Sequence, residues 1–260
     1  MSFLSVAREA ALIGREVHLR YLTGGFHIST KSGVRDRVTT ADIEAEKAIV
    51  AFIREAFPTH NILAEEHSYE PTSSPYTWII DPLDGTNNFS RGFPFFACSV
   101  ALKEGDEVIV GAVCDSVRGE IFTAEKGGGA FLNEEPIHVS EVSDLATSLL
   151  VTGFYQTQSE EVVRNLEVLK RLFRRGILGI RRTGAAALDL CYVACGRVDG
   201  FWEPILNPWD FAAGALIVRE AGGMCTTYEA EPLPFGTSPV LATNGRLHTV
   251  LSEVIREALS

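Results

Sequence analysis

Apolar residues recur at close to helical spacing in two stretches near the start of the chain, residues 5–21 and residues 40–57. This period places the apolar side chains on one face, so each stretch predicts an amphipathic helix. Thr39 is a residue type that caps helix N-termini and Pro58 is one that stops helices, which supports the bounds of the second helix. The polar residues 31–33 between the two helices predict a mobile loop.

Short apolar runs bounded by turn residues predict strands in the part of the chain that follows. Residues 61–64 and 78–80 each run directly into acidic residues and are typical of buried strands. Residues 95–133 alternate apolar runs with glycine-containing turns, which is typical of an antiparallel meander. The first half of the chain is therefore expected to be of the α+β type.

Apolar runs and helical stretches alternate from about residue 140 onward, which predicts an α/β second half. No linker, repeat or low-complexity tract separates the two halves, so residues 1–140 and 141–260 are expected to pack as one unit. The apolar runs lie at residues 149–151, 177–181, 198–202, 224–227 and 240–243, and the predicted helices at residues 160–175, 184–195, 208–221 and 247–259.

The composition excludes a disordered chain. Of the 260 residues, 46% are hydrophobic and 22% are charged, which is enough apolar surface for a large core. No apolar run approaches the ~18 residues of a membrane span, and the first residues lack the segments of a signal peptide, so a cytoplasmic protein is expected. The five cysteines show no CxxC spacing and lie in apolar stretches, which predicts core positions and neither disulfides nor a zinc site.

The net charge of −11, from 34 acidic and 23 basic residues, disfavours a general affinity for nucleic acid or for an anionic membrane. We therefore expect no nucleic-acid partner and no membrane partner. The acidic excess either keeps the protein soluble or includes a site that holds cations.

The densest group of polar residues in an apolar neighbourhood is residues 81–89, Asp-Pro-Leu-Asp-Gly-Thr-Asn-Asn-Phe. Acidic side chains at the carboxyl end of a strand point into the crevice where ligands bind in such sheets. Gly85 permits close approach of a ligand to the backbone, and the N–H groups of Gly85 and Thr86 are placed to hold a phosphate. A lone Asp-Gly pair is typical of an ordinary turn, but the two flanking acids Asp81 and Asp84 favour a site.

Glu65 and Glu66 also follow an apolar strand, 16 residues before Asp81 in the case of Glu65. Neighbouring strands would deliver these acids to the same crevice. Carboxylate oxygens are the ligands that hard cations such as Mg²⁺ prefer. The six histidines are scattered and include no HExxH motif, so the pattern favours magnesium over zinc.

Two further acids allow more than one interpretation. Asp210 follows Asn207 and Pro208 at the third position of a predicted helix, where a carboxylate stabilises the helix dipole without any other role. Asp42 stands in the same relation to Thr39. The pattern alone leaves capping and function as equal alternatives for both acids.

Two partial motifs of other phosphatases are accidental matches by their context. Residues 84–86 end like the DxDGT motif of haloacid-dehalogenase phosphatases, but Pro82 stands at the nucleophile position and cannot form an acyl phosphate. Cys191 and Arg197 have the CX5R spacing of cysteine phosphatases. That segment continues an apolar helix, however, where a cysteine phosphatase has a polar phosphate loop.

Taken together, these residues resemble the inositol monophosphatase family of Mg²⁺-dependent, lithium-sensitive phosphatases. Residues 78–89 are similar to the family's first signature, and residues 209–223 are similar to its second. Ala64 departs from the glycine that many members have before the glutamate pair. Shorter matches occur in family order at residues 38–42, 64–66, 127–131 and 184–186.

The resemblance implies two to three Mg²⁺ ions in the active site. Glu65, Asp81 and the carbonyl of Leu83 would bind the first ion. Asp81, Asp84 and Asp210 would bind the second, and Glu65 would contribute to a weaker third. These five carboxyl-bearing or carbonyl-bearing residues come from both halves of the chain.

The resemblance also implies the catalytic groups. Asp42 would orient the Thr86 hydroxyl, and together they would position and help deprotonate the water that attacks phosphorus in line. The N–H groups of Gly85 and Thr86 would hold the phosphate, and Lys31 would close over the site. The catalytic residues by this resemblance are Asp42, Glu65 and Thr86.

On the substrate side, Glu203 matches an acid that accepts hydrogen bonds from substrate hydroxyls in inositol phosphatases, and Gly184, Ala185 and Ala186 would shape the same wall. The expected fold is the layered α/β/α/β/α sandwich of the inositol monophosphatase and fructose-1,6-bisphosphatase type, and a homodimer is expected.

The expected activity is hydrolysis of myo-inositol monophosphate, a small phosphorylated polyol. Motif relatives hydrolyse fructose 1,6-bisphosphate, histidinol phosphate or 3′-phosphoadenosine 5′-phosphate with the same metal site. A binding or regulatory protein of the same fold is an alternative from a different class, although such a protein would be expected to have lost metal ligands.

Overall fold

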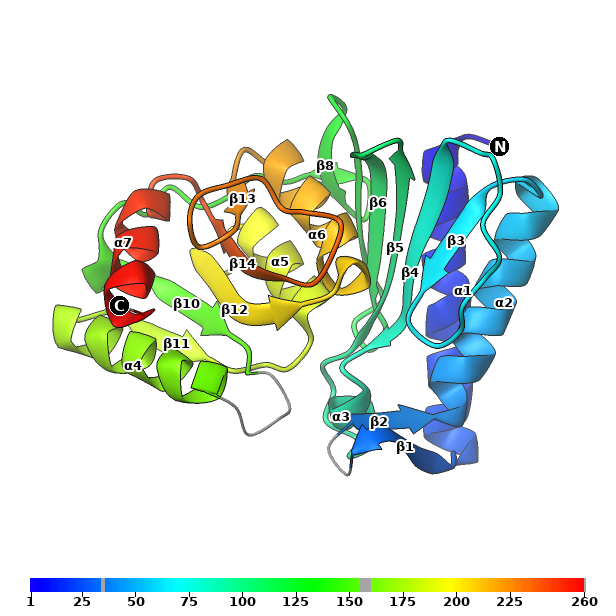
Figure 1. The fold of residues 1–260 in the computed structure, drawn as a ribbon, viewed down its shortest axis with the longest axis horizontal. Coiled ribbons are helices and arrows are strands. Elements are labelled where there is room, and N and C mark those ends of the chain that lie inside the picture. Colours follow the sequence, from blue (N-terminus) through cyan, green and yellow to red (C-terminus); the bar gives the residue numbers. More distant parts are fainter. Residues whose placement is uncertain (34–35, 155–159, 260) are drawn as a thin grey trace.

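The computed structural model describes residues 1–33, 36–154 and 160–259, with only the backbone described for residues 30–33 and 36–37. Within these ranges the chain forms helices, two large β-sheets and a small hairpin (Figure 1). The helices are α1 (Phe3–Gly24), α2 (Thr40–Ala56), α3 (Thr86–Phe89), α4 (Glu160–Arg175), α5 (Ala186–Ala194), α6 (Pro208–Glu220) and α7 (His248–Leu259), with a 3₁₀ turn at Leu145–Thr147.

The strands fall into three sheets that follow the order of the chain. The hairpin pairs β1 (Ile28–Gly33) with β2 (Asp36–Thr39). A seven-stranded sheet has the order β3-β4-β5-β6-β7-β8-β9, and a five-stranded sheet has the order β11-β10-β12-β14-β13. The strands of the larger sheet are β3 (Asn61–Ala64), β4 (Tyr76–Asp84), β5 (Ala97–Glu104), β6 (Glu107–Asp115), β7 (Glu120–Glu125), β8 (Gly129–Leu132) and β9 (Glu135–Pro136). Those of the smaller are β10 (Leu149–Thr152), β11 (Gly179–Arg181), β12 (Gly200–Leu206), β13 (Met224–Thr226) and β14 (Ser238–Thr243).

The elements stack as five layers. Figure 1 shows α1 and α2 outside the seven-stranded sheet, α5 and α6 between the two sheets, and α4 and α7 outside the five-stranded sheet. Separate apolar cores fill the spaces: α1 and α2 pack on one face of the larger sheet, α5 and α6 pack between the sheets, and α4 and α7 pack on the smaller sheet. The α/β/α/β/α architecture expected from the sequence is confirmed, whereas the proposed boundary at residue 140 stays a prediction.

The helix and strand predictions agree with the structure in both halves, with one exception. Residues 31–33 belong to β1, which pairs with β2 in antiparallel fashion from Ile28 opposite Thr39. The prediction of a loop at residues 31–33 is therefore wrong. A polar segment lacks the alternation that marks a strand, and here the backbone hydrogen bonds come from a partner that lies directly before α2.

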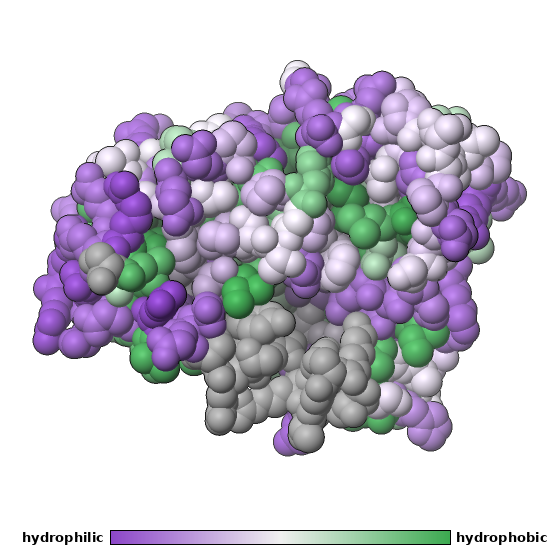
Figure 2. All heavy atoms as spheres, viewed as in Figure 1, coloured by the Kyte–Doolittle hydropathy of each residue, from purple (hydrophilic) through white to green (hydrophobic). Residues whose placement is uncertain are grey.

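The surface and the cysteines agree with a water-exposed exterior around an apolar core. Figure 2 shows a largely hydrophilic face with small, separate apolar areas. Among the described residues, no helix is both long enough and apolar enough to cross a membrane. All five cysteines are free; four are buried, and Cys195 is partly exposed.

The central helix α6 lies very close to the larger sheet because Gly111 on β6 has no side chain. A Cβ atom at Gly111 would lie 2.9 Å from the carbonyl oxygen of Ala213 and 3.0 Å from its Cα. Backbone atoms cannot move aside as a flexible side chain would. The layer spacing at this point therefore depends on a glycine.

Gly111→Ala is expected to lower the free energy of unfolding by about 1–3 kcal/mol, because the added methyl group overpacks the contact with α6. This loss of stability is expected even though the backbone itself favours alanine over glycine in a strand. Gly24→Ala is the matched control, because a Cβ there meets nothing within 4 Å. Urea unfolding midpoints measure both, and equal stability of the two variants would contradict the packing argument.

Candidate active site

The motif at residues 81–89 forms the end of β4, a tight turn and the short helix α3. Gly85 caps α3 with φ 91°, a left-handed conformation that favours glycine. A Cβ at Gly85 would also lie 3.0 Å from the carbonyl oxygen of Phe95. Both the backbone conformation and the close packing therefore require glycine at this turn.

Asp81 and Glu65 lie side by side at the carboxyl ends of two parallel strands. Ala64 on β3 pairs with Ile80 on β4, and the Glu65 N–H donates to the Ile80 carbonyl at 3.3 Å. After burial, the charge of Glu65 is the largest cause that raises the pKa of Asp81. Asp81 is buried, and its Oδ1 accepts from the Leu83 N–H at 3.0 Å.

Asp84 and Asp210 bring two further carboxyl groups to this place. Asp84 Oδ2 accepts the Ala187 N–H at 2.7 Å, at the N-terminus of α5. Asp210 Oδ2 accepts the Asn207 N–H at 2.6 Å, at the N-terminus of α6. Each acid therefore stabilises the start of a central helix, because a negative charge is favourable there.

Burial and mutual repulsion raise the pKa of both aspartates in the motif. Burial is the largest cause for Asp81, followed by the charges of Glu65, Asp84 and Asp210. Burial is also the largest cause for Asp84, followed by the charge of Asp210, while the bond from Ala187 opposes the shift. The carboxyl groups of both halves of the chain therefore form one electrostatic unit.

A hard divalent cation fits this set of donors by its chemistry. Oxygen ligands suit Mg²⁺, and a bound cation would remove the repulsion that raises these pKa values. In residues 1–33, 36–154 and 160–259, however, no three His, Cys, Asp or Glu side chains already stand in the arrangement of a metal site. The ligand set of Glu65, Asp81, Leu83, Asp84 and Asp210 thus stays a prediction.

The Thr86 hydroxyl lies between Asp42 and the main chain of the motif. Its Oγ1 donates to Asp42 Oδ1 at 2.8 Å and also lies 3.1 Å from the Leu83 carbonyl oxygen. Asp42 Oδ2 accepts the N–H of Thr39 at 2.7 Å, so Asp42 caps α2 and contacts Thr86 at once. Burial raises the pKa of Asp42 to about 6, while the bonds from Thr39 and Thr86 oppose the rise.

The predicted substrate wall lies next to this turn. A Cβ at Gly85 would lie 3.3 Å from the Cβ of Ala185, and Gly184 adopts φ 93°. Glu203 on β12 places its carboxyl group against the backbone of Gly153, in space that a side chain at position 153 would fill. The pKa of Glu203 is raised well above its usual value. Burial is the largest cause, and the charges of Asp210, Asp189 and Asp84 come next.

Two polar residues near the site were given no role from the sequence, although Asn88 lies within the motif of residues 81–89. The Asn88 amide donates to the carbonyl oxygens of Phe95 at 2.7 Å and Thr183 at 2.9 Å, which ties α3 to the segment before α5. Asp189 is buried within α5 and accepts from the Thr183 hydroxyl; burial raises its pKa to about 8. Lys31 lies on β1, and its side chain is outside the described part of the structure.

Comparison with known proteins identifies the family. The profile of the inositol monophosphatase family matches residues 1–260, so the chain belongs to the inositol monophosphatase family. This confirms the membership expected from the motifs.

Individual relatives carry two kinds of names. The chain is 43% identical to the inositol-1-monophosphatase of Synechocystis sp. PCC 6803, over 98% of this chain and 88% of the relative. It is 39% identical to the Nus factor SuhB of Escherichia coli K12, over 97% of this chain and 95% of the relative.

Solved structures agree with the fold. The inositol monophosphatase of Anabaena (Nostoc) sp. PCC 7120 superposes with a TM-score of 0.85 at 40% identity, over 98% of this chain and 95% of that chain. An IMPase/NADP phosphatase complexed with Mg²⁺ and phosphate superposes with a TM-score of 0.81 at 25% identity, over 92% and 89%. The family uses Mg²⁺.

His18 on α1 contacts the main chain of the motif at Pro82. The side chain is fully buried; its Nε2 lies 2.8 Å from the Pro82 carbonyl oxygen and its Nδ1 lies 2.7 Å from the Ser116 hydroxyl. A carbonyl only accepts, so Nε2 carries the proton and Nδ1 accepts from Ser116. Burial lowers the pKa of His18 to about 4, and the bond to Pro82 opposes this.

The neutral His18 predicts a loss of stability in mild acid. Between its unfolded pKa of 6.5 and its folded pKa of about 4, the unfolded chain binds the extra proton, so folding weakens as the pH falls through this window. The contribution is roughly 3 kcal/mol across the window. His18→Gln keeps a donor and an acceptor but does not titrate. Between pH 7 and pH 4, the free energy of unfolding from urea titration should therefore fall more in the wild type than in His18→Gln. Parallel pH profiles of the two proteins would contradict this assignment.

Proposed function

We propose that this protein is a Mg²⁺-dependent phosphomonoesterase that hydrolyses myo-inositol monophosphate to inositol and phosphate. The observation that carries the proposal is the group of aspartate side chains beside the Gly85-Thr86 turn, each held by a backbone N–H group. Two comparisons support it: a relative named inositol-1-monophosphatase at 43% identity, and a related structure that holds Mg²⁺ and phosphate.

In this proposal the carboxyl groups hold the ions. Glu65, Asp81 and the Leu83 carbonyl would hold one ion, Asp81, Asp84 and Asp210 would hold a second, and Glu65 would contribute to a weaker third. Bound Mg²⁺ supplies positive charge that activates water and stabilises the leaving oxygen. The burial and mutual repulsion of Asp81 and Asp84 support the assignment.

The other groups of the chain handle the phosphate and the proton. The N–H groups of Gly85 and Thr86 hold the phosphate oxygens. Thr86 Oγ1 orients the attacking water and passes its proton toward Asp42 Oδ1, which lies 2.8 Å away. The water oxygen bonds to phosphorus as the bond between phosphorus and the inositol oxygen breaks, and the inositol oxygen takes a proton from a solvent water, while Asp42 later returns its proton to solvent. A pKa of about 6 suits Asp42 as a base near neutral pH.

Glu203 faces the substrate hydroxyls in this proposal, with Gly184, Ala185 and Ala186 shaping the wall, and Lys31 closes over the site. The same chemistry on fructose 1,6-bisphosphate, histidinol phosphate or 3′-phosphoadenosine 5′-phosphate is the alternative within the class. A homodimer and a cytoplasmic location remain predictions.

A role as a binding protein is the second candidate. Its support is the 39% identity to a protein named Nus factor SuhB over nearly the whole of both chains. The expectation that the chain has no nucleic-acid partner therefore stays a prediction. The complete set Glu65, Asp81, Asp84, Thr86 and Asp210 favours an enzyme, whatever else the protein binds.

Phosphate release from a panel of these four esters tests the activity. We expect turnover of inositol monophosphate with Mg²⁺, no turnover in EDTA, and inhibition by lithium. Turnover that persists in EDTA would exclude the metal mechanism, and a preference for the nucleotide would exclude the inositol assignment. Failure to release phosphate from any ester would favour the binding role, which a pull-down would then examine.

Asp84→Asn is expected to lower turnover by at least about 100-fold, because it removes a charge that the transition state requires. Asparagine can still accept the Ala187 N–H, so the fold should survive.

A hundredfold excess of Mg²⁺ over its Kd should stabilise the wild type by about 2.7 kcal/mol, and raise Tm by roughly 5 °C or more. This Tm shift should shrink in Asp84→Asn.

Glu107→Gln is the matched control for this substitution. It makes the same change of charge at a side chain that is 58% exposed and pairs with Lys126. It should leave both turnover and the Mg²⁺ shift unchanged. A wild-type Tm that does not respond to Mg²⁺, or an unaffected rate in Asp84→Asn, would place the site elsewhere.

A further inference from the structure

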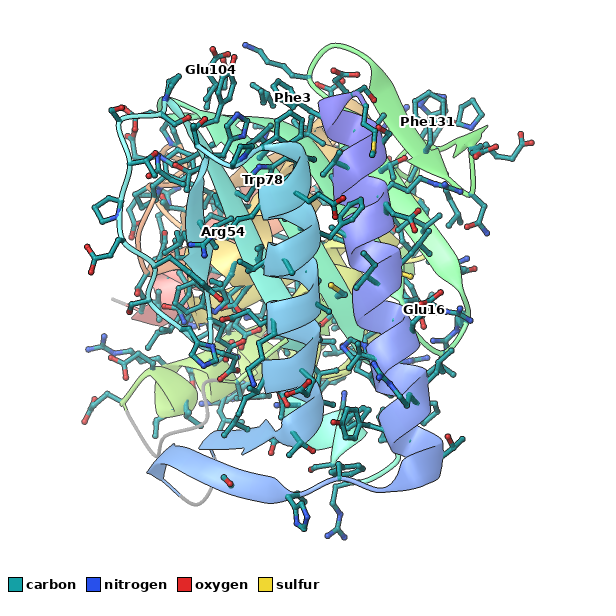
Figure 3. All side chains as sticks on the ribbon, turned by 90° about the vertical axis from the view of Figure 1, so that its right-hand side faces the viewer. Phe3, Glu16, Arg54, Trp78, Glu104 and Phe131 are labelled. Carbon is teal, nitrogen blue, oxygen red and sulfur yellow. The ribbon has the colours of Figure 1, made fainter. Side chains whose placement is uncertain are left out.

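Helix α2 carries two buried carboxylates one turn apart, Asp42 and Glu46, which therefore lie on the same face. Asp42 holds Thr86, as described above. Glu46 is fully buried as well, with 0% of its side chain exposed. Figure 3 shows α2 lying over the larger sheet beside α1, with Arg54 projecting from it. Glu46 has no place in the proposed mechanism, so its burial needs another explanation.

In the described part of the chain, three hydrogen bonds to the Glu46 carboxyl group come from the segment directly after Glu65. The Glu66 N–H donates to Oε2 at 2.8 Å, His67 Nδ1 lies 2.8 Å from Oε1, and the Tyr69 hydroxyl donates to Oε1 at 3.0 Å. Burial of a carboxylate is costly unless several donors satisfy it. This carboxylate is therefore the point to which residues 66–69 are attached.

The Tyr69 bond is well defined by its surroundings. The pKa of Tyr69 is raised strongly, by burial first and by the charge of Glu46 second. The phenol therefore keeps its proton and remains a donor. Arg54 lies in the last turn of α2, and its guanidinium stands over the Tyr69 ring, 5.1 Å from the ring centroid. The segment after Glu65 is thus packed against α2 at two points.

The backbone around Glu65 is consequently held on both sides. The Glu65 N–H donates to Ile80 on β4, at 3.3 Å, and the next N–H, that of Glu66, donates to Glu46 on α2, at 2.8 Å. A residue whose own N–H group and following N–H group are both hydrogen-bonded has little freedom to move its Cα atom. Glu46 therefore helps to fix the direction in which the Glu65 side chain leaves the backbone.

We propose that Glu46 is a positioning residue for the Mg²⁺ ligand Glu65, so that α2 orients both the Thr86 hydroxyl and a metal-binding carboxylate from one face. This inference rests on the proposed function. Partners that orient a metal ligand typically change metal affinity by about 10- to 100-fold when they are removed. Glu46→Gln keeps the volume and one acceptor but loses the charge that three donors share.

The test is calorimetric titration of the apo protein with Mg²⁺, together with kcat and the Mg²⁺ concentration for half-maximal rate. Glu46→Gln should bind Mg²⁺ about 10- to 100-fold more weakly than the wild type. Its kcat should recover at saturating Mg²⁺, because the catalytic groups themselves are intact. A merely structural role would lower Tm in EDTA without changing Mg²⁺ affinity.

Asp199→Asn is the matched control. Asp199 is also a buried carboxylate, 5% exposed, and it accepts the Leu149 N–H at 2.7 Å and a bond from Ser140, but it lies at the start of β12. It should lower Tm in EDTA and leave Mg²⁺ affinity unchanged. Equal Mg²⁺ affinity in the wild type and Glu46→Gln would overturn the inference, as would equal weakening in Asp199→Asn.

Tyr69→Phe keeps the inference falsifiable if Glu46→Gln does not fold. It removes one of the three donors, and a several-fold weaker Mg²⁺ affinity is expected, whereas unchanged affinity would overturn the inference. A wild type that binds no Mg²⁺ is a different result, because it refutes the proposed function itself and the inference with it.

Discussion

The repulsion among carboxyl groups at the ends of β3, β4 and the start of α6 is the constraint on which the rest of the structure depends. Like charges in a buried place are unfavourable, and burial with mutual repulsion raises the pKa of Asp81 and Asp84 together. The chain holds them by backbone N–H groups of Leu83, Ala187 and Asn207. A backbone N–H group thereby orients each of these aspartates.

Two helices of the central layer supply two of those donors at their N-termini. Helices α5 and α6 lie between the two sheets, and their N-termini point at the aspartates of the motif and of α6 itself. The close contact at Gly111 lets α6 approach the larger sheet. The site therefore sits where the two halves of the chain meet, and neither half holds all of the acids.

Much of this arrangement was predictable from the sequence, because the signals were local. The amphipathic periods of α1 and α2, the meander and the acids that follow β3 and β4 all express short-range rules. The β1–β2 hairpin was not predictable, since its polar residues show no alternation.

The supporting contacts were also beyond the sequence pattern. His18 reaches Pro82 over 64 positions, and Asn88 reaches Thr183 over 95, so only the packed fold brings them together. The spacing of Asp42 and Glu46 on the inner face of α2 was the one local signal that could have indicated the second buried carboxylate. For Asp42, the structure shows that capping and contact with Thr86 are compatible, so the sequence alternatives were not exclusive.

The space beside Gly153 has a consequence for the history of this protein. Because the carboxyl group of Glu203 occupies the volume where a side chain at position 153 would stand, any larger residue at position 153 would force the end of the Glu203 side chain to move. A descendant of this protein with a larger residue at position 153 would therefore carry a redirected Glu203 side chain or a shorter residue at position 203.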